Sequence, residues 1–580
     1  MAKGSIALKN LLRRIKNPLS FPYLNEKKAK DGFWHSRQRN GDFRLLTSTK
    51  RSTESSQSQE RASSLEKKIK FQDGKIAYKN LTTSQLIRAY LVFNICGFRW
   101  VVNNSDRLLQ ASLRIFGTTI VKWALRPTMF GHFCGGEDLR TIQPTVENLK
   151  RSGIGGILDY AAEADVGADV TISTASADSD VPTTTRSNQA LAREYSYQTE
   201  RQCDANVKIF ETAIRAVHGV TPDGFAAIKV TALGNPILLE RWSTALREIY
   251  KLFGRMDVDK DGMVTFEEFT NVWNQLFVGD SMEIIINDMF KRFDKKGKGF
   301  IDPIAWTTTL DPPLMRRLAG YCKKQGSFAQ AVLTTDEEKL VKSMQSRLRR
   351  LVALAADLNV RLMIDAEHTY FQPAIDNLVL SMQREFNKNT DCVYQTIQCY
   401  LKDARTRNQL FMDQARIENW QYAVKIVRGA YMHQERDRAK KRGEEDPIHS
   451  TIEDTHKCYE EIMEDVISRE NVQEGREKVN LVVATHNQSS VECTIRLLEE
   501  YGLERMESGV AFGQLLGMSD HLTYSLGQNG YKVYKYIPYG PILECLPYLI
   551  RRAQENSDLM GSVGYELGML AKEIRRRMIG

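Results

Sequence analysis

Eight short apolar segments recur along this chain, and most of them are separated by stretches with helical periodicity. This alternation constrains the fold more than any other feature, because strands that alternate with helices pair in parallel within one sheet. The predicted strands span residues 153–160, 226–233, 360–365, 393–400, 424–430, 480–485, 509–514 and 531–537. Helices are predicted between them, among others over residues 203–217, 403–418, 452–467 and 490–501. Because eight strand–helix units close a (β/α)8 barrel, we predict an α/β barrel, with an open doubly wound sheet as the alternative.

The composition of the 580-residue chain is that of a globular protein, with 42% hydrophobic and 26% charged residues. A chain of this length is expected to hold several domains or large insertions. The formal charge of +9 is spread along the sequence, and no basic stripe interleaved with aromatic residues is present, which argues against nucleic acid as a partner. The nine cysteines are scattered and form no Cys-x-x-Cys motif, so we expect free thiols and neither disulfides nor a zinc site.

The first 64 residues differ in character from the rest of the chain. Residues 1–20 hold five lysines and arginines and no acid, and their leucines and isoleucines fall on one helical face. Such a start is typical of a mitochondrial transit peptide, with a disordered basic tail as the alternative. Residues 47–64 are rich in Ser, Thr, Gln and Glu and are predicted to be disordered. The further predicted divisions are an N-terminal helical segment, a first barrel part, a helical insertion, and the remaining barrel with C-terminal helices: residues 65–150, 151–235, 236–335 and 336–580.

One apolar run, residues 86–102, lies within the N-terminal helical segment. It is interrupted by Arg88 and Arg99, and it is shorter than the roughly 18 apolar residues that a membrane-spanning helix needs. We interpret it as a core helix, with contact to a membrane surface as the alternative.

Polar and charged residues stand at or near the ends of several predicted strands. They are Asp365, Gln398, Arg428, His486, Gln514 and Tyr536, together with Lys229 inside the second strand. Buried parallel strands are normally made of Val, Ile and Leu. The carboxyl ends of barrel strands meet at one mouth, where barrel enzymes place their active sites. We therefore predict a functional site at this mouth; the alternatives are a helix cap for Asp365, a core position for His486 and a solvated Lys229.

The last predicted strand is followed by a Pro-Tyr-Gly-Pro turn and by a helix that we expect to begin at Pro541. Tyr548, Arg551 and Arg552 fall at i, i+3 and i+4 on this helix and so lie on one face. Two guanidinium groups beside an aromatic ring suit a carboxylate ligand, which a guanidinium fork binds in a bidentate way. A solvated basic face is the alternative.

The interval between the second and third predicted strands is far longer than an ordinary crossover. Within it, residues 257–268 match the EF-hand loop, with acids at positions 1, 3 and 5, Gly at position 6 and Glu at position 12. A second loop starts 37 residues later, at Asp294, but it has lysines at positions 3 and 5 and alanine at position 12. We predict an inserted EF-hand-like helical subdomain in which only the first loop binds Ca2+. The predicted ligands are Asp257, Asp259, Asp261, the carbonyl of Met263, and Glu268.

Several stretches near the strand ends resemble the proline dehydrogenase (proline oxidase) family. They are RLMIDAE at 361–367, KIVRGAY at 425–431, THN at 485–487, FGQLLG at 512–517 and PYLIRR at 547–552. The resemblance covers roughly residues 130–557, apart from the insertion and an acidic tract at 163–188 that is predicted to be an exposed loop. The chain looks like a eukaryotic, mitochondrial member of this family.

The resemblance implies a distorted (β/α)8 barrel that binds FAD without covalent attachment and oxidises L-proline to Δ1-pyrroline-5-carboxylate. It also implies ubiquinone as the electron acceptor and peripheral contact with the matrix side of the inner mitochondrial membrane. The sequence agrees with a flavin bound outside a Rossmann fold, because no Gly-x-Gly-x-x-Gly follows a predicted strand.

By the same resemblance, six residues are expected at the cofactor: Gln398, Lys425, Arg428, Thr485, His486 and Asn487. Arg428 is expected on the N5 side of the flavin, where its charge stabilises the reduced anionic form.

Eight residues are expected to surround the substrate: Lys229, Asp365, Leu516, Tyr536, Tyr548, Arg551, Arg552 and Glu555. The resemblance implies that Arg551 and Arg552 clamp the carboxylate with help from Lys229, while Asp365 fixes the charges around that clamp. These four residues form the expected catalytic set. The two tyrosines and the leucine are expected to wall the proline ring, and the glutamate is expected to pair with Arg551.

Three other functions are consistent with the sequence. A hydroxyproline dehydrogenase has the same scaffold, but members of that type are smaller at the position of Tyr536, so the tyrosine favours proline. A calcium-sensing interaction protein on an inactive barrel is suggested by residues 257–268 and disfavoured by the arginine pair, Asp365 and His486. A calcium-regulated enzyme would combine both activities.

Overall fold

The computed structural model describes residues 69, 71–161, 199–221, 223–277, 282–324, 326–472, 480–558 and 560–579. The predictions about the first 64 residues and about the acidic tract at 163–188 fall outside these ranges.

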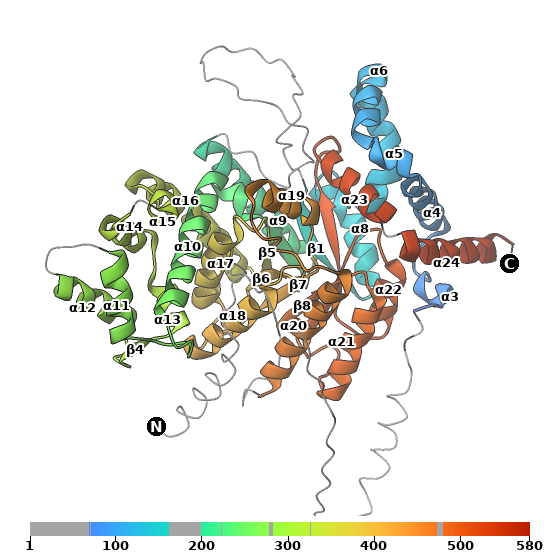
Figure 1. The fold of residues 1–580 in the computed structure, drawn as a ribbon. Helices are drawn as coiled ribbons and strands as arrows, with labels where there is room; N and C mark the ends of the chain where they lie inside the picture. The colour runs from blue at the N-terminus through green and yellow to red at the C-terminus, as the bar shows by residue number, and fades with distance from the viewer. Residues whose placement is uncertain are drawn as a thin grey trace, which may run out of the picture.

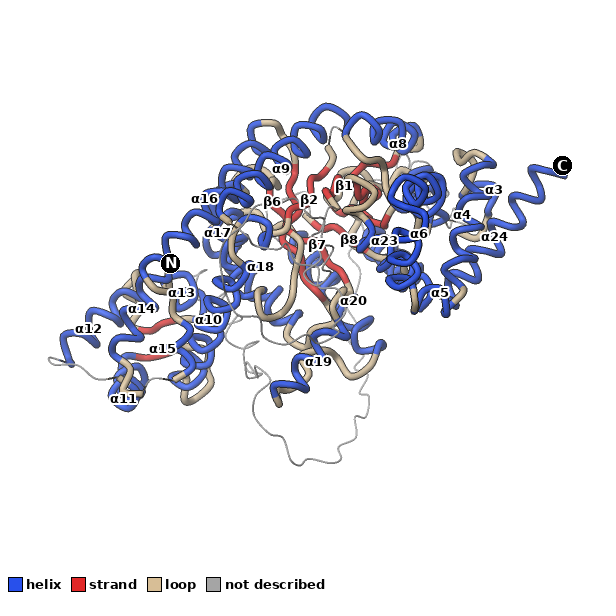
Figure 2. The backbone as a smooth tube through the Cα atoms, turned by 90° about the horizontal axis from the view of Figure 1, so that it is seen from above, coloured by secondary structure: helices blue, strands red, loops and turns tan. Residues whose placement is uncertain are grey.

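Eight parallel strands close into a barrel (Figures 1 and 2). Their order around the barrel is β1-β10-β9-β8-β7-β6-β5-β2, and β1 pairs with both β10 and β2. The strands are β1 (Ile154–Tyr160), β2 (Phe225–Ile228), β5 (Arg361–Ile364), β6 (Val393–Gln398), β7 (Val424–Val427), β8 (Leu481–Ala484), β9 (Val510–Leu515) and β10 (Val533–Tyr539). The predicted barrel is confirmed. The open doubly wound sheet is wrong, because the first and last strands are hydrogen-bonded to each other.

The barrel interior is filled by side chains. Phe225 meets Tyr394 and Tyr534 edge to face, with ring centroids 5.2 and 5.0 Å away. Gly155 is required in β1, because a Cβ atom at this position would lie 2.4 Å from the ring of Tyr534. Tyr536 packs against this inner cluster from the side of the mouth. The packed interior leaves the carboxyl-terminal mouth as the place for polar chemistry.

Helices cover the outside of the barrel (Figure 2). They are α8 (Leu139–Arg151), α9 (Glu200–Val220), α16 (Thr335–Asp357), α17 (Gln372–Phe386), α18 (Ala404–Glu418), α20 (Ile452–Val472), α21 (Gln488–Glu500) and α22 (Asp520–Gln528). Some begin at caps that the sequence encodes. At the start of α16, the Thr334 hydroxyl accepts a bond from the Glu337 N–H, and the Glu337 carboxylate accepts one from the Thr334 N–H. The four helices named from the sequence are all present.

The second strand is shorter than predicted, and the prediction that Lys229 lies inside it is wrong. β2 ends at Ile228, and Val230–Leu233 forms a 3-10 turn, η2. The cause is a tertiary contact, because the Glu367 carboxylate accepts bonds from the Thr231 N–H at 3.1 Å and from its hydroxyl at 2.6 Å. These bonds occupy donors that a longer strand would use, so Lys229 stands at the carboxyl end of β2, next to the mouth.

The last barrel strand leads into α23 (Leu546–Asp558), which starts later than predicted. Pro541 begins a separate turn, in which its carbonyl accepts bonds from the N–H groups of Glu544 and Cys545 at 2.9 and 3.0 Å. The arginine pair therefore lies in the second turn of a new helix.

Between β2 and β5 the chain forms a helical insertion at one side of the barrel (Figure 1). It contains α10 (Pro236–Met256), β3 (Val264–Thr265), α11 (Phe266–Leu276), α12 (Met282–Phe293), β4 (Phe300–Ile301), α13 (Pro303–Thr309), α14 (Pro312–Tyr321) and α15 (Ser327–Ala331). The loop after α10 and the loop after α12 are joined by antiparallel pairing of β3 with β4. Trp306 stacks on Phe293 with ring centroids 4.4 Å apart. The insertion thus holds two helix–loop–helix units packed as a pair.

A second group of helices lies on the other side of the barrel, away from the insertion (Figures 1 and 2). It contains α3 (Gly74–Ala77), α4 (Thr83–Gly97), α5 (Arg99–Asn103), α6 (Ser105–Leu125), η1 (Arg126–Phe130) and α7 (Gly131–Phe133). The C-terminal helix α24 (Met560–Ile579) packs on α4. Arg577 of α24 donates to the carbonyl oxygens of Tyr78 at 2.6 Å and Leu81 at 2.5 Å. Among the described residues, no helix is both long and apolar enough to cross a membrane.

Candidate active site

A buried charge network lies at the carboxyl ends of β5, β7 and β10. Asp365 follows β5 and accepts bonds from the Lys425 ammonium at 2.5 Å and from the Tyr536 hydroxyl at 2.8 Å. Lys425 faces the inside because it alternates with Val424 and Ile426, which pack toward the outer helices. Burial alone would raise the pKa of Asp365, but the charges of Lys425 and Lys229 outweigh it and lower that pKa. Asp365 is therefore a carboxylate held by two cations.

A second group centres on Arg428, just after β7. Its guanidinium donates to His456 Nδ1 at 2.9 Å, to the Thr485 hydroxyl at 2.8 Å and to the Ser490 hydroxyl at 2.9 Å. It also lies over the Tyr459 ring, 4.5 Å from its centroid. Within the described part of the chain, these contacts of Arg428 include no carboxylate. Three hydrogen bonds and one ring contact therefore fix the position of the guanidinium.

His486 lies at the end of β8, next to the turn after β9. Its Nδ1 is 3.1 Å from the Ser519 hydroxyl. Burial lowers the pKa of His486 to about 3, and the nearby charges of Lys535 and Arg552 add to this effect. The imidazole is therefore neutral at physiological pH and is able to hydrogen-bond without carrying charge.

The other residues expected at the cofactor make contacts with the backbone. Gln398 donates to the Glu367 carbonyl at 2.8 Å. Asn487 caps α21 by accepting a bond from the Ser490 N–H at 3.2 Å, and Thr485 accepts one from the Asn487 N–H at 3.0 Å. The structure therefore places Thr485 beside Arg428 and gives Asn487 a capping role.

The arginine pair lies on α23, which reaches the mouth from the end of β10. Arg552 is 3% exposed, and it donates to the Glu555 carboxylate at 2.6 Å. Its guanidinium carbon lies 4.9 Å from the centroid of the Tyr548 ring. The Nε of Arg552 and the hydroxyl of Tyr548 are buried and make no hydrogen bond within the described part of the chain. Buried polar atoms of this kind indicate a site that a polar ligand completes. Glu555 thus contacts Arg552, and its expected pairing with Arg551 stays a prediction.

Two site residues escaped the sequence analysis. Asp159, near the end of β1, is 5% exposed, and its charge adds to burial in raising the pKa values of Tyr536 and Tyr548. Lys535 of β10 is fully buried; it donates to the Met518 carbonyl at 2.6 Å and pairs with Asp520 at 2.7 Å. One feature of the sequence could have identified both: each is a charged residue within an otherwise apolar strand, and such a residue needs a buried partner.

The turn between β9 and α22 adds Leu516, which is only partly buried. Its N–H donates to the Tyr536 carbonyl at 3.0 Å, and Lys535 also holds this turn through the Leu515 carbonyl at 3.1 Å. Leu516 is thus fixed directly beside Tyr536, as expected for two walls of one pocket.

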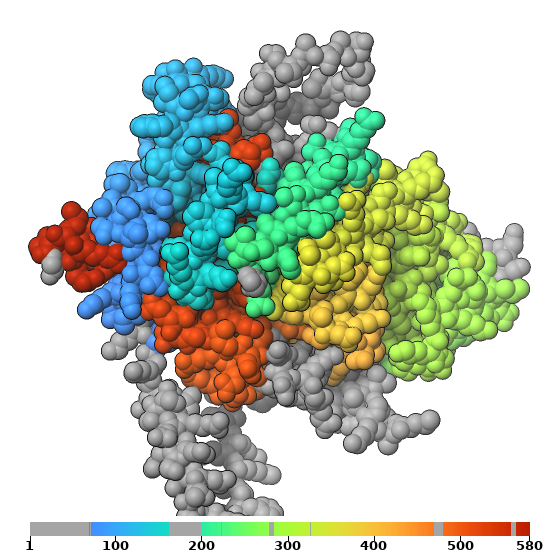
Figure 3. Space-filling view, turned by 180° about the vertical axis from the view of Figure 1, so that it is seen from behind, coloured from blue at the N-terminus to red at the C-terminus, as the bar shows by residue number. Residues whose placement is uncertain are grey.

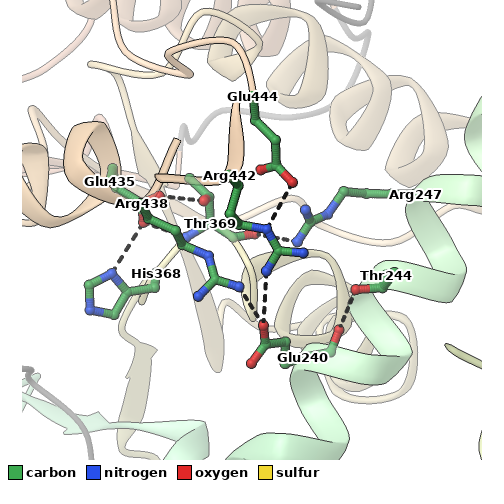
Figure 4. A network of polar contacts seen from close by, with 9 residues as sticks. All are labelled: Glu240, Thr244, Arg247, His368, Thr369, Glu435, Arg438, Arg442 and Glu444. Carbon is green, nitrogen blue, oxygen red and sulfur yellow. Dashed lines mark hydrogen bonds and ion pairs between the residues drawn. The ribbon is translucent and has the colours of Figure 1, made fainter. Parts of the chain in front are cut away.

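Helix α19 (Met432–Arg442) follows β7 and therefore lies on the side of the mouth (Figure 1). Its Glu435 is 2% exposed and accepts bonds from the Thr369 N–H at 2.7 Å, the Thr369 hydroxyl at 2.5 Å and His368 Nδ1 at 3.2 Å. Farther along α19, Arg438 and Arg442 both pair with Glu240 of α10 (Figure 4). The helix is thereby fixed to the loop after β5 and to the insertion.

Of the cavities formed by the described residues, two border the insertion or the N-terminal helices. One, of about 480 Å3, lies between the insertion and the helices α17, α18 and α19, and none of the residues expected at substrate or cofactor lines it. The other, of about 710 Å3, lies between α4, α22 and α24 and reaches Leu516.

The predicted metal ligands lie together in the loop after α10. Asp257, Asp259 and Asp261 each place one carboxylate oxygen within 4.8 Å of the others. The Met263 N–H donates to Asp261 at 2.8 Å, and the Glu268 carboxylate accepts a bond from the Val258 N–H at 3.1 Å. The loop therefore brings the predicted acidic ligands to one place.

The mouth also fits a flavin on its own chemistry. Arg428 offers a positive charge without a carboxylate partner among the described residues, and neutral hydrogen-bonding groups at Gln398, Thr485 and His486 adjoin it. Such a set suits the polar edge of an isoalloxazine whose reduced form is an anion.

The fold and its mouth define the class of this protein: a (β/α)8-barrel protein with a buried charge network at the mouth of the barrel. The family model for proline dehydrogenase matches residues 142–564. The proteins named "Proline dehydrogenase 1, mitochondrial" of Caenorhabditis elegans and Homo sapiens are each 35% identical to this chain, over 548 and 545 residues. These alignments cover 88% of this chain in both cases, and 88% and 90% of the two relatives. The chain belongs to the proline dehydrogenase family, whose members are flavin-dependent in general.

Two further comparisons complete the picture. The protein of Xenopus laevis named "Hydroxyproline dehydrogenase" is 28% identical over 510 residues, which cover 88% of this chain and 90% of that protein. The solved structure of proline utilization A (PutA) from Bdellovibrio bacteriovorus inactivated by N-propargylglycine shares 14% identity at a TM-score of 0.49; it covers 87% of this chain and 40% of that longer chain. The resemblance found in the sequence is confirmed at the level of the family.

Proposed function

We propose that this chain uses FAD, bound without covalent attachment at the barrel mouth, to oxidise L-proline to Δ1-pyrroline-5-carboxylate. The observation that carries the proposal is the buried Arg552 Nε on α23, which makes no hydrogen bond among the described residues. Arg428, which contacts no carboxylate in that part of the chain, lies at the end of β7. When bound, a flavin supplies the two-electron acceptor for the hydride that leaves the carbon next to the proline nitrogen.

The arginine pair binds the substrate carboxylate in this proposal. Glu555 fixes one arm of the Arg552 guanidinium, which leaves the buried Nε as a donor. Charge-assisted bonds from Arg551 and Arg552 orient the ring, with Tyr548, Tyr536 and the turn at Leu516 as its walls. Orientation of this kind contributes several kcal/mol to a reaction because the reacting atoms are held near attack distance.

In this proposal the charge network around Asp365 lies beneath the bound proline ring. Asp365 holds the Tyr536 hydroxyl and the Lys425 ammonium, and Lys229 adds a second cation. Because its hydroxyl is bonded to Asp365, the Tyr536 side chain cannot move away from the bound proline ring. Asp365 and Lys229 therefore act in this proposal by positioning the wall and balancing charge around the carboxylate.

Six residues hold the cofactor in this proposal: Gln398, Lys425, Arg428, Thr485, His486 and Asn487. Arg428 supplies the charge that favours the reduced anion, and its three neutral acceptors keep that charge available.

An absorbance spectrum tests the assignment. The purified protein should be yellow, and L-proline should bleach its flavin band in the absence of oxygen. A colourless protein that does not oxidise proline would instead support the calcium-sensing interaction protein on an inactive barrel.

Hydroxyproline is the second candidate substrate, since two relatives are named hydroxyproline dehydrogenase. The Tyr536 ring, fixed by its 2.8 Å bond to Asp365, fills space that an added hydroxyl would need. We expect kcat/KM to be higher for L-proline than for hydroxyproline in a direct comparison. The reverse order would change the assignment.

Ubiquinone as acceptor, and a peripheral position on the matrix side of the inner mitochondrial membrane, also belong to the proposal. They are supported by relatives whose names include "mitochondrial". Reduction of a short-chain ubiquinone by proline, together with release of the protein from mitochondrial membranes by alkaline carbonate, is the expected result.

We further propose that residues 257–268 form an EF-hand loop that binds one Ca2+. Asp257 Oδ1 is buried and makes no hydrogen bond among the described residues. Burial raises the pKa of Asp257 to about 6, and the charges of Asp261, Asp259 and Glu268 add to this effect, so a cation is the missing partner.

The second loop, which starts at Asp294, is not expected to bind Ca2+. The Lys298 ammonium pairs with Asp302 at 2.8 Å, and the Asp294 carboxylate already accepts bonds from the N–H groups of Lys298 and Gly299. Titration calorimetry should therefore detect one calcium ion per chain, and none in the Asp257→Asn variant. Two bound ions, or one that survives this substitution, would contradict the proposal. Activity that differs between chelator and calcium would identify the calcium-regulated enzyme.

A further inference from the structure

The helices α4, α5 and α6 carry large apolar side chains on their outer surface. Seven of them are more than half exposed: Leu91 (56%), Phe98 (65%), Trp100 (69%), Ile115 (72%), Phe116 (56%), Ile120 (54%) and Trp123 (79%). We call these seven residues the outer apolar face. They come from three consecutive helices at one edge of the molecule, which stand out in blue in the view from behind (Figure 3). A gathering of this size marks an interaction surface, because scattered single residues are the rule elsewhere.

The outer apolar face does not result from loose helices. On the opposite side of α4, Val92, Phe93 and Cys96 are buried. Helix α24 packs against α4, and α23 packs against both α4 and α5. Helices α4 and α5 are therefore anchored on one side while their other side stays apolar and open to solvent. Helix α6 extends from them, and Val121 is its one buried residue (Figure 1).

The charge around the outer apolar face is mostly positive. Residues 81–136 include six lysines and arginines but only one acid, Asp106. Arg99, Arg107 and Arg114 are exposed and lie between the aromatic residues along the chain. Cations that border exposed tryptophans suit the head-group region of an anionic bilayer, where an indole has an apolar body and a polar N–H.

We propose that α4–α6 is the surface by which this protein binds an anionic lipid bilayer. The outer apolar face enters the boundary between head groups and acyl chains, and the arginines contact lipid phosphates. A soluble protein partner would match the apolar residues but would not require the excess of cations. The earlier alternative for residues 86–102, contact with a membrane surface, is thus extended to three helices with named contact residues.

Helix α4 also borders a cavity that reaches the turn after β9. The cavity of about 710 Å3 is lined by Arg88 and Phe93, on the side of α4 opposite the outer apolar face, and by Leu516 and Gly517 of that turn. A lipid-dissolved acceptor would therefore approach the mouth from the membrane side, a consequence that rests on the proposed function, whereas the bilayer contact does not.

Flotation of the purified full chain with lipid vesicles tests the contact. Neutral phosphatidylcholine vesicles are compared with the same vesicles carrying an anionic phospholipid. The protein should float with the anionic vesicles, and the double variant Trp100→Glu/Trp123→Glu should bind at least about tenfold less, because both substitutions place charge in the boundary region. Tryptophan emission should shift to the blue on binding in the original protein and not in the variant.

A matched control comes from exposed isoleucines elsewhere. Ile237 at the start of α10 and Ile452 at the start of α20 are 64% and 62% exposed, and Ile237→Glu/Ile452→Glu should float like the original protein. Replacement of Arg99, Arg107 and Arg114 by glutamine should remove the preference for anionic lipid. Equal flotation of the tryptophan variant and its control, or no flotation of the original protein, would overturn the proposal.

Two further measurements distinguish bilayer binding from dimerisation, and the bilayer contact from the proposed function. If light scattering shows a dimer that the tryptophan variant loses, the face joins two copies of the chain and the proposal is wrong. Proline oxidation with a soluble dye should be equal in the original and variant proteins, while oxidation with a vesicle-borne quinone should fall in the variant. Loss of dye activity in the original protein would contradict the proposed function and leave the flotation result intact.

Discussion

At the scale of single residues, one ionised carboxylate organises the mouth. Asp365 is the partner of Lys425 and Tyr536 and lies near Lys229, so four strands meet through its charge. The lowered pKa of Asp365 means that its stabilising contribution is complete above the ordinary aspartate value and is lost as pH falls through the lowered one.

The substitution Asp365→Asn should therefore destabilise the fold strongly. It removes the carboxylate that the buried Lys425 ammonium contacts at 2.5 Å, and breaking a buried pair in this way costs about 3–5 kcal/mol. Urea unfolding at pH 7.5 measures the loss, and kcat/KM for proline should fall with it. Asp336→Asn is the matched control, because Asp336 and its partner Lys339 are 89% and 72% exposed and their pair should contribute little. Equal unfolding midpoints for the two variants would contradict the account.

His486 gives a second residue-level prediction, on pH. The unfolded imidazole takes up a proton near pH 6.5, whereas the folded one stays neutral down to about pH 3. Between these values the unfolded state binds more protons, so stability falls as pH falls, by up to about 1.4 kcal/mol per pH unit from this residue. The profile of His486→Gln between pH 7 and pH 4 should be shallower than that of the original protein. Parallel profiles would show that burial does not hold this histidine neutral.

At the scale of elements, the sequence predicted the barrel strands well and their ends less well. Alternation of strands with helices is a local property, which is why all eight strands appear in their predicted order. The end of β2 depends on Glu367, more than a hundred residues away, which binds Thr231 and turns the chain. Propensity in Val230–Leu233 favours a strand, and the tertiary contact overrides it.

Helix α19 shows the same limit. Its sequence is polar on nearly every side, and only Glu435 and Ala439 are buried. Such a helix has no apolar stripe by which it could be predicted from the sequence. Its position is fixed by ion pairs and by one buried carboxylate. The two missed site residues, Asp159 and Lys535, were readable as charges within apolar strands. Their partners were not readable from the local sequence: Lys535 contacts Met518 in the turn after β9 and Asp520 of α22, and Asp159 affects Tyr536 of β10 and Tyr548 of α23.

The element-level prediction contrasts two glutamates that hold α19. Glu435→Gln disturbs a buried acceptor of three hydrogen bonds, so it should cost about 1–3 kcal/mol of unfolding free energy. Glu240→Gln breaks a half-exposed pair and should cost less than about 1 kcal/mol. Urea unfolding gives both values, and faster amide exchange at residues 368–371 should accompany only the first. The opposite order would show that α10, and not the loop after β5, fixes this helix.

At the scale of the whole molecule, the barrel lies between the helical insertion (α10–α15) and the N-terminal helices (α3–α7). The insertion was visible in the sequence as a long interval with a calcium-loop pattern, but its contact with the mouth was not. Glu240 and Arg438 are 198 positions apart, and no local pattern encodes their pairing. The N-terminal segment was predicted to be helical. Which face of α4 and α5 is exposed to solvent could not be predicted, because it depends on where α23 and α24 pack.

The central claim is that α23 holds the carboxylate of proline against a flavin at the barrel mouth. Anaerobic flavin absorbance during titration with L-proline tests it most directly, for the original protein and for Arg552→Ala, with Arg349→Ala of the exposed Arg349–Glu385 pair as control. We predict full bleaching in the original and control proteins, and bleaching slowed at least about 100-fold in Arg552→Ala, with its flavin still bound. Bleaching of Arg552→Ala at the original rate and proline concentration would contradict the account.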